Sequence, residues 1–332
     1  MNRIRIAING FGRIGRCFFR NSFHLSNIEI VAINDLTDTK TLAHLLKYDS
    51  VHRIYDKQVT YDKDHLIVEG AKIKVVSSKD PSLLPWKEMK IDVVIESTGH
   101  FLDKLSANKH IVAGAKKVIL SAPPTDETIK TIVLGVNDHT LSAEDTIISN
   151  ASCTTNCSAP MLKVLEQFGI EDAYVTTVHS YTGDQRIHDA PHKDLRRARA
   201  AAMSIIPTTT GAAKALTKIF PELEGKIGGC GMRVPVPDGS LTDITCVLKD
   251  YPTVEQINTA FKKSSETDLK GIMEYTEDPI VSIDCVGNPH SVVFDSEFTS
   301  VVGNLVKVIG WYDNEWGYSN RLVDLVIKMG NL

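Results

Sequence analysis

The chain has 332 residues, of which 42% are hydrophobic and 23% are charged, and its net charge is −4. These proportions are those of an ordinary globular protein that is long enough for two domains. The weakly acidic balance excludes a global basic field for nucleic acid or an anionic membrane. No apolar run approaches the roughly 18–20 residues of a membrane span.

The opening stretch, MNRIRIAINGFGRIG, lacks the long apolar core and the cleavage site of a signal peptide. The cysteines are scattered, without CxxC pairs, at positions 17, 153, 157, 230, 246 and 285. This usage favours reduced thiols in a cytoplasmic protein over a disulfide frame, and we expect no metal site. The basic run KDLRRAR is short and lacks interleaved aromatic residues, so we expect no nucleic-acid partner.

The first motif in chain order is a glycine-rich turn between a strand and a helix. The strand pattern RIRIAIN leads into GFGRIG, which contains Gly10, Gly12 and Gly15, and a second strand pattern, IEIVAIND, ends on Asp35. Strand, glycine turn, helix, strand and acid together match the dinucleotide fingerprint. The glycines let the backbone approach a pyrophosphate at the helix N-terminus. Asp35 can accept hydrogen bonds from ribose hydroxyls, which predicts NAD rather than NADP.

The rest of the first half continues this alternation of strands and helices. We expect helices over 37–50 and Asn108–Lys117, a small meander over 57–80, and strands over 91–99, 116–124, 131–137 and 145–152. Such alternation predicts a mostly parallel sheet with helices on both faces, in a first domain over residues 1–150. Ligands of such a sheet bind where the strands end, so Thr98, Gly99 and Ser121 are candidate cofactor contacts.

The second half has consecutive strands, which indicate an antiparallel sheet. We expect helices over 157–169, 208–226, 252–266 and 314–330, strands over 172–182, 229–237, 240–250 and within 280–310, and a long ordered loop over 183–204. Pro160 requires the first of these helices to start late or to be kinked. The predicted fold class is therefore α/β, with a Rossmann-type parallel sheet domain followed by an α+β catalytic domain over 151–313. The C-terminal helix, residues 314–332, is expected to pack back on the first domain.

Cys153, in SNASCTTNCSAP, is the candidate nucleophile, and His179, 26 residues later in TTVHSYTGDQR, is the candidate base. A helix N-terminus or an imidazolium lowers a thiol pKa from about 8.5, and we expect both near Cys153. The alternative is that Cys153 is a small buried hydrophobe, as many free cysteines are. Its polar neighbours and the dinucleotide motif favour the catalytic interpretation. Cys157 lies a turn deeper and is interpreted as structural.

Anion sites are expected near the starts of two predicted helices, the one after Cys153 and the one after the TTTG stretch. The TTTG stretch, which ends in Thr210 and Gly211, combines hydroxyls, backbone N–H groups and a helix dipole, and Ser152 and Thr154 do the same beside Cys153. Planar guanidinium groups suit phosphate, and the candidates are Arg196, Arg197, Arg199 and Arg233. At least one arginine of the RRAR run is expected to face solvent or another subunit.

These parts combine into one reaction class. A thiolate adds to an aldehyde, hydride passes to nicotinamide, and the resulting thioester is attacked by inorganic phosphate to release an acyl phosphate. His179 would take the thiol proton and assist oxidation as a general base.

The motifs resemble those of phosphorylating glyceraldehyde-3-phosphate dehydrogenases of the bacterial type. The resemblance covers nearly the whole chain and is carried by NGFGRIGR, ESTG, GAKKVILSAP, SNASCTTNCSAP, TTVHSYTGDQR, IPTTTGAAKA and WYDNEWGYS. It implies NAD-dependent conversion of D-glyceraldehyde 3-phosphate to 1,3-bisphosphoglycerate in glycolysis, by a homotetramer. Cys153 would be the nucleophile and His179 its activator.

The resemblance also implies the binding residues. The substrate's own phosphate would be held by Thr182 and Arg233, with Asp184 nearby. The attacking phosphate would be bound by Ser152, Thr154, Thr210, Gly211 and Arg197, with Arg196 left open as the alternative arginine. NAD would be bound by Gly10, Gly12, Arg13, Ile14, Gly15, Asp35, Thr98, Gly99, Ser121 and Asn314. Lys79 stands where many bacterial members carry an adenine-side arginine.

Two other functions remain open from the sequence. Erythrose-4-phosphate dehydrogenases share the cysteine motif and resemble the chain at NPHS and DNEWG, but they typically lack the threonine of HSYT and the TTG turn, both present here. A binding or redox-sensing protein that uses Cys153 only as an oxidisable thiol is the second alternative.

Overall fold

A computed structural model describes residues 3–332, and residues 1 and 2, with which the predicted first domain begins, lie outside the described part. Contacts divide the chain into two compact units. The first contains the residues up to Ile132, His139–Ala151 and Ser319–Leu332, and the second contains Val133–Asp138 and Ser152–Tyr318. Residues 133–138 thus cluster with the second unit, although the sequence analysis assigned them to the first domain.

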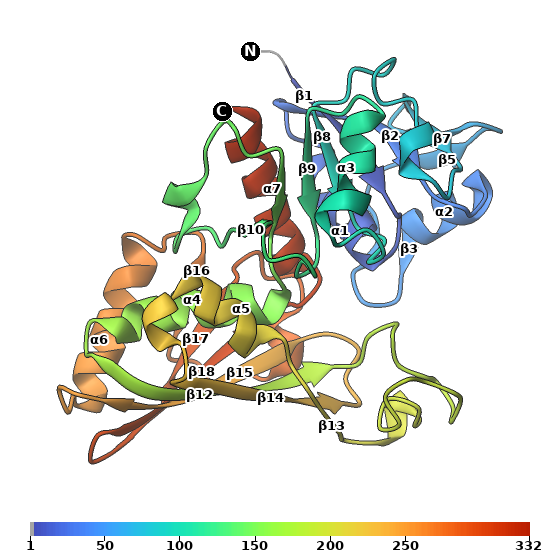
Figure 1. Cartoon of the computed structure of the whole chain (residues 1–332). Coiled ribbons are helices and arrows are strands. Elements are labelled where there is room, and N and C mark those ends of the chain that lie inside the picture. The colour runs from blue at the N-terminus through green and yellow to red at the C-terminus, as the bar shows by residue number, and fades with distance from the viewer. Residues whose placement is uncertain (1–2) are drawn as a thin grey trace. The chain divides into compact units, whose positions relative to one another are not determined.

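The first unit is built on a nine-stranded sheet within the described residues (Figure 1). Its strands, in spatial order, are β10 (Lys130–Thr131), β11 (Ile147–Ser149), β9 (Lys117–Leu120), β8 (Val93–Glu96), β1 (Ile4–Asn9), β2 (Ile28–Asn34), β7 (Ala71–Val76), β6 (His65–Val68) and β5 (Val59–Tyr61). Pairing is parallel from β10 to β7 and antiparallel through the β7–β6–β5 meander. The apolar strands are buried, as expected where parallel strands lie inside a layered domain.

Three complete helices belong to this unit: α1 (Arg13–Ser22), α2 (Thr39–Lys47) and α3 (Lys104–Val112). A two-stranded ribbon, β3 (Tyr48–Asp49) with β4 (Arg53–Ile54), follows α2. The last helix, α7 (Trp316–Gly330), closes the chain, and the Lys117 Nζ donates to the Met329 carbonyl at 3.0 Å within this unit.

Two sequence predictions in this unit were wrong in their bounds. The helix predicted over Asn108–Lys117 starts earlier, because the Asp103 side chain caps it by accepting from the Ser106 N–H. Lys117 instead begins β9. The strand predicted over 131–137 is reduced to Thr131 at the end of β10, because the chain turns at Gly135, whose φ is +78°.

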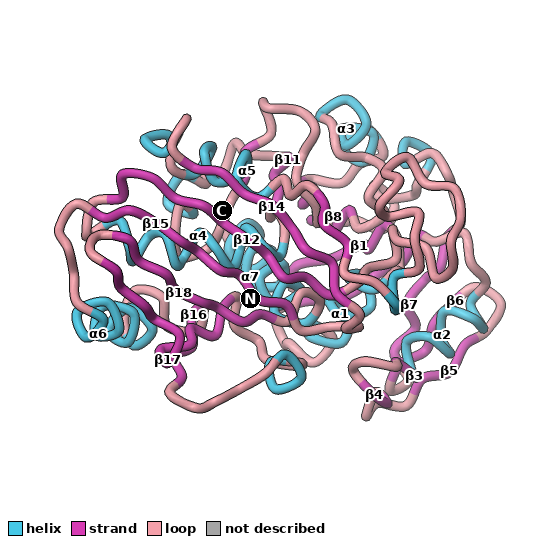
Figure 2. The backbone as a smooth tube through the Cα atoms, turned by 90° about the horizontal axis from the view of Figure 1, so that it is seen from below, coloured by secondary structure: helices cyan, strands magenta, loops and turns pink. Residues whose placement is uncertain are grey.

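The second unit contains a seven-stranded mixed sheet within the described residues, and Figure 2 shows its strands side by side. In spatial order they are β13 (Ile206–Thr208), β14 (Ile227–Val234), β12 (Ile170–Ser180), β15 (Ser240–Leu248), β18 (Leu305–Tyr312), β17 (Val292–Val302) and β16 (Met273–Thr276). The β12–β14 and β16–β17 pairs are parallel and the other pairs are antiparallel. The predicted fold class, an α/β domain followed by an α+β domain, is therefore confirmed. The sheet of the second unit is mostly antiparallel.

Helices α4 (Cys153–Glu166), α5 (Ala212–Ile219) and α6 (Val254–Glu266) lie on one face of this sheet (Figure 1). Short 3₁₀ helices occur at Pro81–Leu83, Asp138–Thr140, Ala201–Met203, Pro221–Leu223 and Ser282–Cys285. The helix predicted over 157–169 begins instead at Cys153, because Ser152 caps it, and Pro160 lies inside it. Residues 183–204 form the predicted long loop, which contains the 3₁₀ turn at Ala201–Met203. Residues 280–291, where strands were expected to begin, form no strand. Within the described chain, each helix is too short or too polar to cross a membrane.

Candidate active site and dinucleotide cavity

Cys153 is the first residue of α4, and its sulfur faces His179. The Ser152 hydroxyl caps the helix by accepting from the Thr155 N–H at 3.1 Å. His179 lies near the end of β12, is 6% exposed, and brings its Nε2 to 3.4 Å from the Cys153 Sγ. The two predicted catalytic residues are therefore brought into hydrogen-bond contact within one unit, which the sequence alone did not establish.

The imidazole tautomer follows from its second nitrogen. The His179 Nδ1 lies 2.7 Å from the Ser180 carbonyl oxygen, which can only accept, so we assign the proton to Nδ1. The Arg233 Nη1, 3.1 Å from Nδ1, already donates to the Ser180 carbonyl and to the Thr182 hydroxyl. Nε2 is then left with a lone pair directed at the thiol, as a general base requires.

The ionisation of this pair differs from the sequence-based expectation. Burial, and after it the nearby Arg233 charge, lower the pKa of His179 to about 4, so the imidazole is neutral at pH 7. Burial raises the pKa of the Cys153 thiol to about 11, although Arg233 opposes this. The expected lowering of the thiol pKa was wrong for this chain, because desolvation outweighs Arg233 and the hydrogen bonds from Thr154, and the neutral imidazole adds no positive charge. The resting pair is a thiol and a neutral base.

Arg233 anchors a charged cluster beside the pair. It is the register partner of His179 across the parallel β12–β14 ladder, so both side chains are on the same face. Thr182 donates to the Asp184 carboxylate, and Arg197 pairs with the other oxygen of that carboxylate at 2.5 Å. Burial alone would raise the pKa of Asp184, but the Thr182 hydrogen bond and the two guanidinium groups lower it. The Arg197 Nε also lies 3.7 Å from the Asp194 carboxylate, so the cluster holds two guanidinium groups and two carboxylates.

The arginine that sequence analysis left open is distinguished by its contacts. The Arg197 Nε also donates to the Thr208 hydroxyl at 3.0 Å, whereas the Arg196 side chain is exposed. Thr210 accepts from the Ala212 N–H at 3.2 Å, and Gly211 precedes α5 as its N-cap. The structure thus ties Arg197 to the cluster and places Thr210 and Gly211 at a second helix start in the same unit.

Tyr312 is a site residue that sequence reasoning missed. Its hydroxyl lies 2.9 Å from the Thr154 hydroxyl and 2.8 Å from the Thr177 hydroxyl, and its ring meets the His179 ring edge to face at 6.0 Å. It is 158 residues from Thr154 in sequence, and no local pattern signals the contact. Thr154 is 5% exposed, so its hydroxyl is engaged inward in this structure.

Asn314 is hydrogen-bonded to Ser180, the residue that follows His179 in the chain. Its Oδ1 accepts from the Ser180 hydroxyl at 2.8 Å and from the Ser240 hydroxyl at 2.6 Å. Two donors on one oxygen fix the amide orientation and direct the Nδ2 donor away from them. The carboxamide of a nicotinamide offers the carbonyl that such a donor needs.

Five of the predicted NAD residues of the first unit line one cavity of about 560 Å³. Its lining includes Gly10, Gly12, Asp35, Lys79 and Thr98 from the prediction. It also includes residues not predicted: Asn9, Asn34, Leu36, Ser78, Ser97, His100 and Phe101. The Asp35 carboxylate accepts from the Phe11 N–H at 2.8 Å and so also shapes the glycine turn.

The glycine turn fits a dinucleotide. Gly10 has φ +91°, and a Cβ there would lie 2.9 Å from the Thr98 nitrogen. A Cβ on Gly15 would collide with the Gly10 carbonyl oxygen, so helix and turn approach each other as the fingerprint requires. Gly12 is the N-cap of α1 and supplies no side-chain cap, which leaves the helix N-terminus open to an anion.

The remaining predicted cofactor residues lie around this turn. Ile14 and Arg13 are in the first turn of α1, and the Arg13 guanidinium pairs with the Asp49 carboxylate at 2.5 and 3.0 Å. Gly99 has φ +75°, and Ser121 follows β9 with its N–H bonded to the Glu96 carbonyl at 2.9 Å. None of these four is among the lining residues of the cavity.

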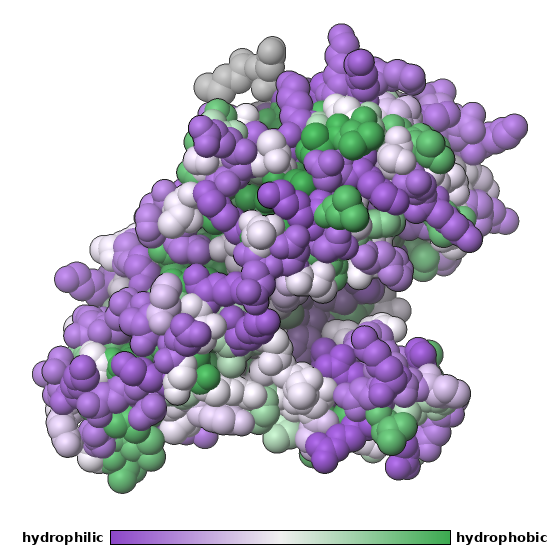
Figure 3. Space-filling model, in the orientation of Figure 1, coloured by the Kyte–Doolittle hydropathy of each residue, from purple (hydrophilic) through white to green (hydrophobic). Residues whose placement is uncertain are grey.

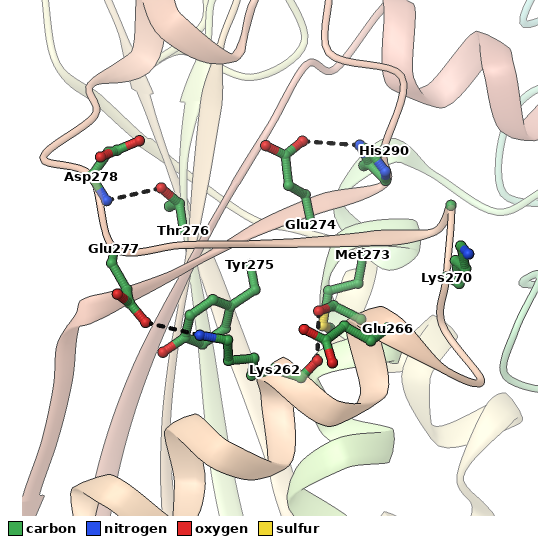
Figure 4. Close-up of a pocket in the computed structure, with 12 residues that line it drawn as sticks. Lys262, Glu266, Lys270, Met273, Glu274, Tyr275, Thr276, Glu277, Asp278 and His290 are labelled. Carbon is green, nitrogen blue, oxygen red and sulfur yellow. Dashed lines mark hydrogen bonds and ion pairs between the residues drawn. The ribbon is translucent and has the colours of Figure 1, made fainter.

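A further cavity, of about 700 Å³, lies in the second unit beside α6 and β16 (Figure 4). Its charged groups face one another: Glu274 pairs with His290 at 3.1 Å, and Lys262 approaches Glu277 at 3.4 Å. Its lining contains none of the residues selected from the sequence. We therefore do not assign the reaction to it.

Comparison with known proteins identifies the family of the chain. Residues 4–104 match the family described as glyceraldehyde 3-phosphate dehydrogenase, NAD binding domain, and residues 152–314 match the family's C-terminal domain. Glyceraldehyde-3-phosphate dehydrogenase 2 of Streptomyces avermitilis is 58% identical over 332 residues, which cover 99% of each chain. The glyceraldehyde-3-phosphate dehydrogenase of Borreliella burgdorferi is 58% identical over 98% of this chain and 99% of its own, and that of Mycobacterium tuberculosis is 54% identical over 98% of each. Nothing in these matches favours an erythrose-4-phosphate dehydrogenase. The chain therefore belongs to the glyceraldehyde-3-phosphate dehydrogenase family.

Proposed function

We propose that the chain oxidises D-glyceraldehyde 3-phosphate, with NAD and inorganic phosphate, to 1,3-bisphosphoglycerate through a thioester on Cys153. As a member of this family it is an NAD-dependent oxidoreductase. The observation that carries the residue roles is the 3.4 Å contact between the Cys153 Sγ and the His179 Nε2.

The first step belongs to Cys153 and His179. The sulfur attacks the aldehyde carbon, a C–S bond forms, and the carbonyl oxygen ends as the hydroxyl of a hemithioacetal. Because the resting thiol holds its proton, His179 removes it as the C–S bond forms rather than beforehand. The N-terminus of α4 places a positive dipole end beside the developing oxyanion.

Bound NAD supplies the two-electron acceptor that converts the hemithioacetal to a thioester. The chain's part in this step is to hold a base: His179 Nε2 takes the hydroxyl proton as the carbon is oxidised. Asn314 is proposed to bind the nicotinamide amide, and the residues around the glycine turn are proposed to bind the rest of the dinucleotide.

The last step transfers the acyl group to phosphate. A phosphate oxygen attacks the acyl carbon, the C–S bond breaks, and the sulfur leaves to regain its proton. Arg233 and Thr182 are proposed to hold the substrate's phosphate, with Asp184 orienting the Thr182 hydroxyl. The attacking phosphate is proposed to be held by Ser152, Arg197, Thr210 and Gly211, whereas the Thr154 hydroxyl, also expected from the sequence, is engaged by Tyr312. Guanidinium and hydroxyl donors favour a phosphate nucleophile over water.

The test is NADH formation from glyceraldehyde 3-phosphate, measured with and without phosphate or arsenate. Wild type should form NADH in repeated turnovers only when phosphate or arsenate is present, and Cys153→Ser should form none. Cys157→Ser is the matched control, because Cys157 is fully buried in the same helix, and it should keep the activity. Turnover by Cys153→Ser, or faster phosphate-independent oxidation of erythrose 4-phosphate, would contradict the assignment.

We also propose a homotetrameric assembly and a cytoplasmic location. The loop over 183–204 and its continuation carry apolar side chains that are largely exposed in the single chain, namely Ile187, Leu195, Met203 and Ile205. Figure 3 shows apolar side chains on the hydrophilic lobe that this loop forms. Such exposure supports a homotetramer, which light scattering after size exclusion would test. A cytoplasmic location, tested by cell fractionation, follows from the proposed glycolytic role.

A further inference from the structure

A buried polar network lies beneath the dinucleotide cavity. Glu96 is the last residue of β8, and Asn9 is the last residue of β1, and the parallel register pairs them directly. His110 reaches them from α3. All three are 0% exposed, so the network is sealed from solvent.

The Glu96 carboxylate is saturated by donors. Its Oε1 accepts from the Thr98 N–H at 2.8 Å and from the Thr98 hydroxyl. Its Oε2 accepts from the Asn9 Nδ2 at 2.5 Å and from the His110 Nε2 at 3.0 Å. Four donors fill the sites that two carboxylate oxygens offer, so each donor is fixed by a charged acceptor.

The far side of His110 sets its tautomer. The Trp86 indole N–H can only donate, and it lies 3.0 Å from the His110 Nδ1. Nδ1 therefore accepts, and the ring proton lies on Nε2 and points at Glu96. The Phe101 ring, which lines the cavity, packs edge-on against His110 with ring centroids 6.3 Å apart.

The network ends on the cavity wall. The Asn9 Oδ1 accepts from the Asn34 Nδ2 at 2.6 Å, and Asn34 exchanges hydrogen bonds with the backbone of Ser78 at 2.9 Å in each direction. Asn9, Asn34, Ser78 and Thr98 all line the cavity, whereas Glu96 and His110 do not.

We propose that Glu96 and His110 are positioning residues for the dinucleotide: they fix Asn9 and Thr98 in the cavity wall without touching the ligand. This inference rests on the proposed cofactor site. A buried carboxylate near an anionic ligand would oppose its binding by charge repulsion, so any gain in affinity from Glu96 must come from the donors that it holds in place.

The experiment measures NAD dissociation constants by calorimetry, together with melting temperatures, for wild type and five variants. Glu96→Gln has the same shape but turns one acceptor into a donor, and it should weaken NAD binding about tenfold. His110→Leu removes the Nε2 donor and should do the same. His110→Gln should restore binding to within about threefold of wild type, because its amide nitrogen reaches the Nε2 position. Trp86→Phe perturbs the same core but leaves the Nε2 donor in place, so it should lower the melting temperature with little change in affinity.

Equal or tighter NAD binding by Glu96→Gln would overturn the proposal, since relief of charge repulsion would then dominate. Loss of stability in Glu96→Gln without loss of affinity would show that the network only supports the core. If His110→Leu fails to fold, Glu96→Gln alone decides. Asp35→Ala separates this proposal from the cofactor site: weakened binding by Asp35→Ala but not by Glu96→Gln refutes only the positioning role, whereas unchanged binding by Asp35→Ala refutes the proposed site.

Discussion

His179 should make the stability of the chain depend on pH in a way that His179→Asn removes. The imidazole is 6% exposed, and its pKa is lowered from 6.5 to about 4 by burial and by Arg233. Asparagine keeps a donor near the Nδ1 position for the Ser180 carbonyl, 2.7 Å away in wild type, but it does not titrate. The variant thus removes the proton site while keeping the local hydrogen bond.

The sign follows from proton binding in the two states. The unfolded chain protonates this histidine below pH 6.5, whereas the folded chain does so only near pH 4, so protons favour unfolding between these values. The stability that depends on neutral His179 is complete above pH 6.5 and falls as the pH drops. At 1.36 kcal/mol per pKa unit, the loss between pH 7 and pH 5 is about 2 kcal/mol.

The assay is urea unfolding at pH 7 and pH 5, in wild type and His179→Asn, with the difference between the two proteins taken at each pH. That difference should change by about 2 kcal/mol, with wild type losing more stability on acidification. His188→Asn is the control, because His188 is exposed in the long loop, and it should follow wild type.

Parallel pH curves for wild type and His179→Asn would refute this reasoning. They would mean that His179 takes up a proton equally readily in the folded and unfolded chains. The thiol would then face an imidazolium near neutral pH, and proton removal would precede attack on the aldehyde.

Three other changes test other parts of the structure. Gly10→Ala should destabilise the first unit by more than about 1 kcal/mol and weaken NAD binding in calorimetry. The reason is that φ is +91° and the new Cβ would lie 2.9 Å from the Thr98 nitrogen. Wild-type affinity in this variant would show that the turn adapts. Asp49→Asn should lose less stability than wild type between pH 4 and pH 2 in acid unfolding. Burial raises the pKa of Asp49, but hydrogen bonds from Arg13 and the backbone outweigh it and hold that pKa at about 2. A pH dependence equal to that of wild type would count against this. Tyr312→Phe should cost about 1–3 kcal/mol in urea unfolding, because two buried threonine hydroxyls lose their partner; unchanged stability would mean that they find others.

The glycine turn and the start of the Cys153 helix were located from the sequence because each depends on local chain geometry. A glycine turn between a strand and a helix, followed by an acid at the end of the next strand, is one continuous βαβ segment, so Gly10 and Asp35 meet at the cavity without help from distant residues. Ser152 caps the helix that begins at Cys153 for the same local reason. Helix bounds such as those of α3 were missed where a single capping side chain, Asp103, decided the start.

Contacts between segments that lie far apart in the sequence were decided only by the tertiary structure. The parallel register of β12 and β14 puts Arg233 beside His179, and the antiparallel β15–β18 pair places the Tyr312 hydroxyl near Thr154. Burial is also a tertiary property, and it reversed the expected direction of the Cys153 pKa, because desolvation depends on what surrounds the sulfur. The sequence by itself determined the glycine turn and the motifs that contain Cys153 and His179, since motif and turn geometry are local. The tertiary structure determined their protonation and the orientation of their partners, since hydrogen bonds and solvent exclusion come from segments far apart in the chain.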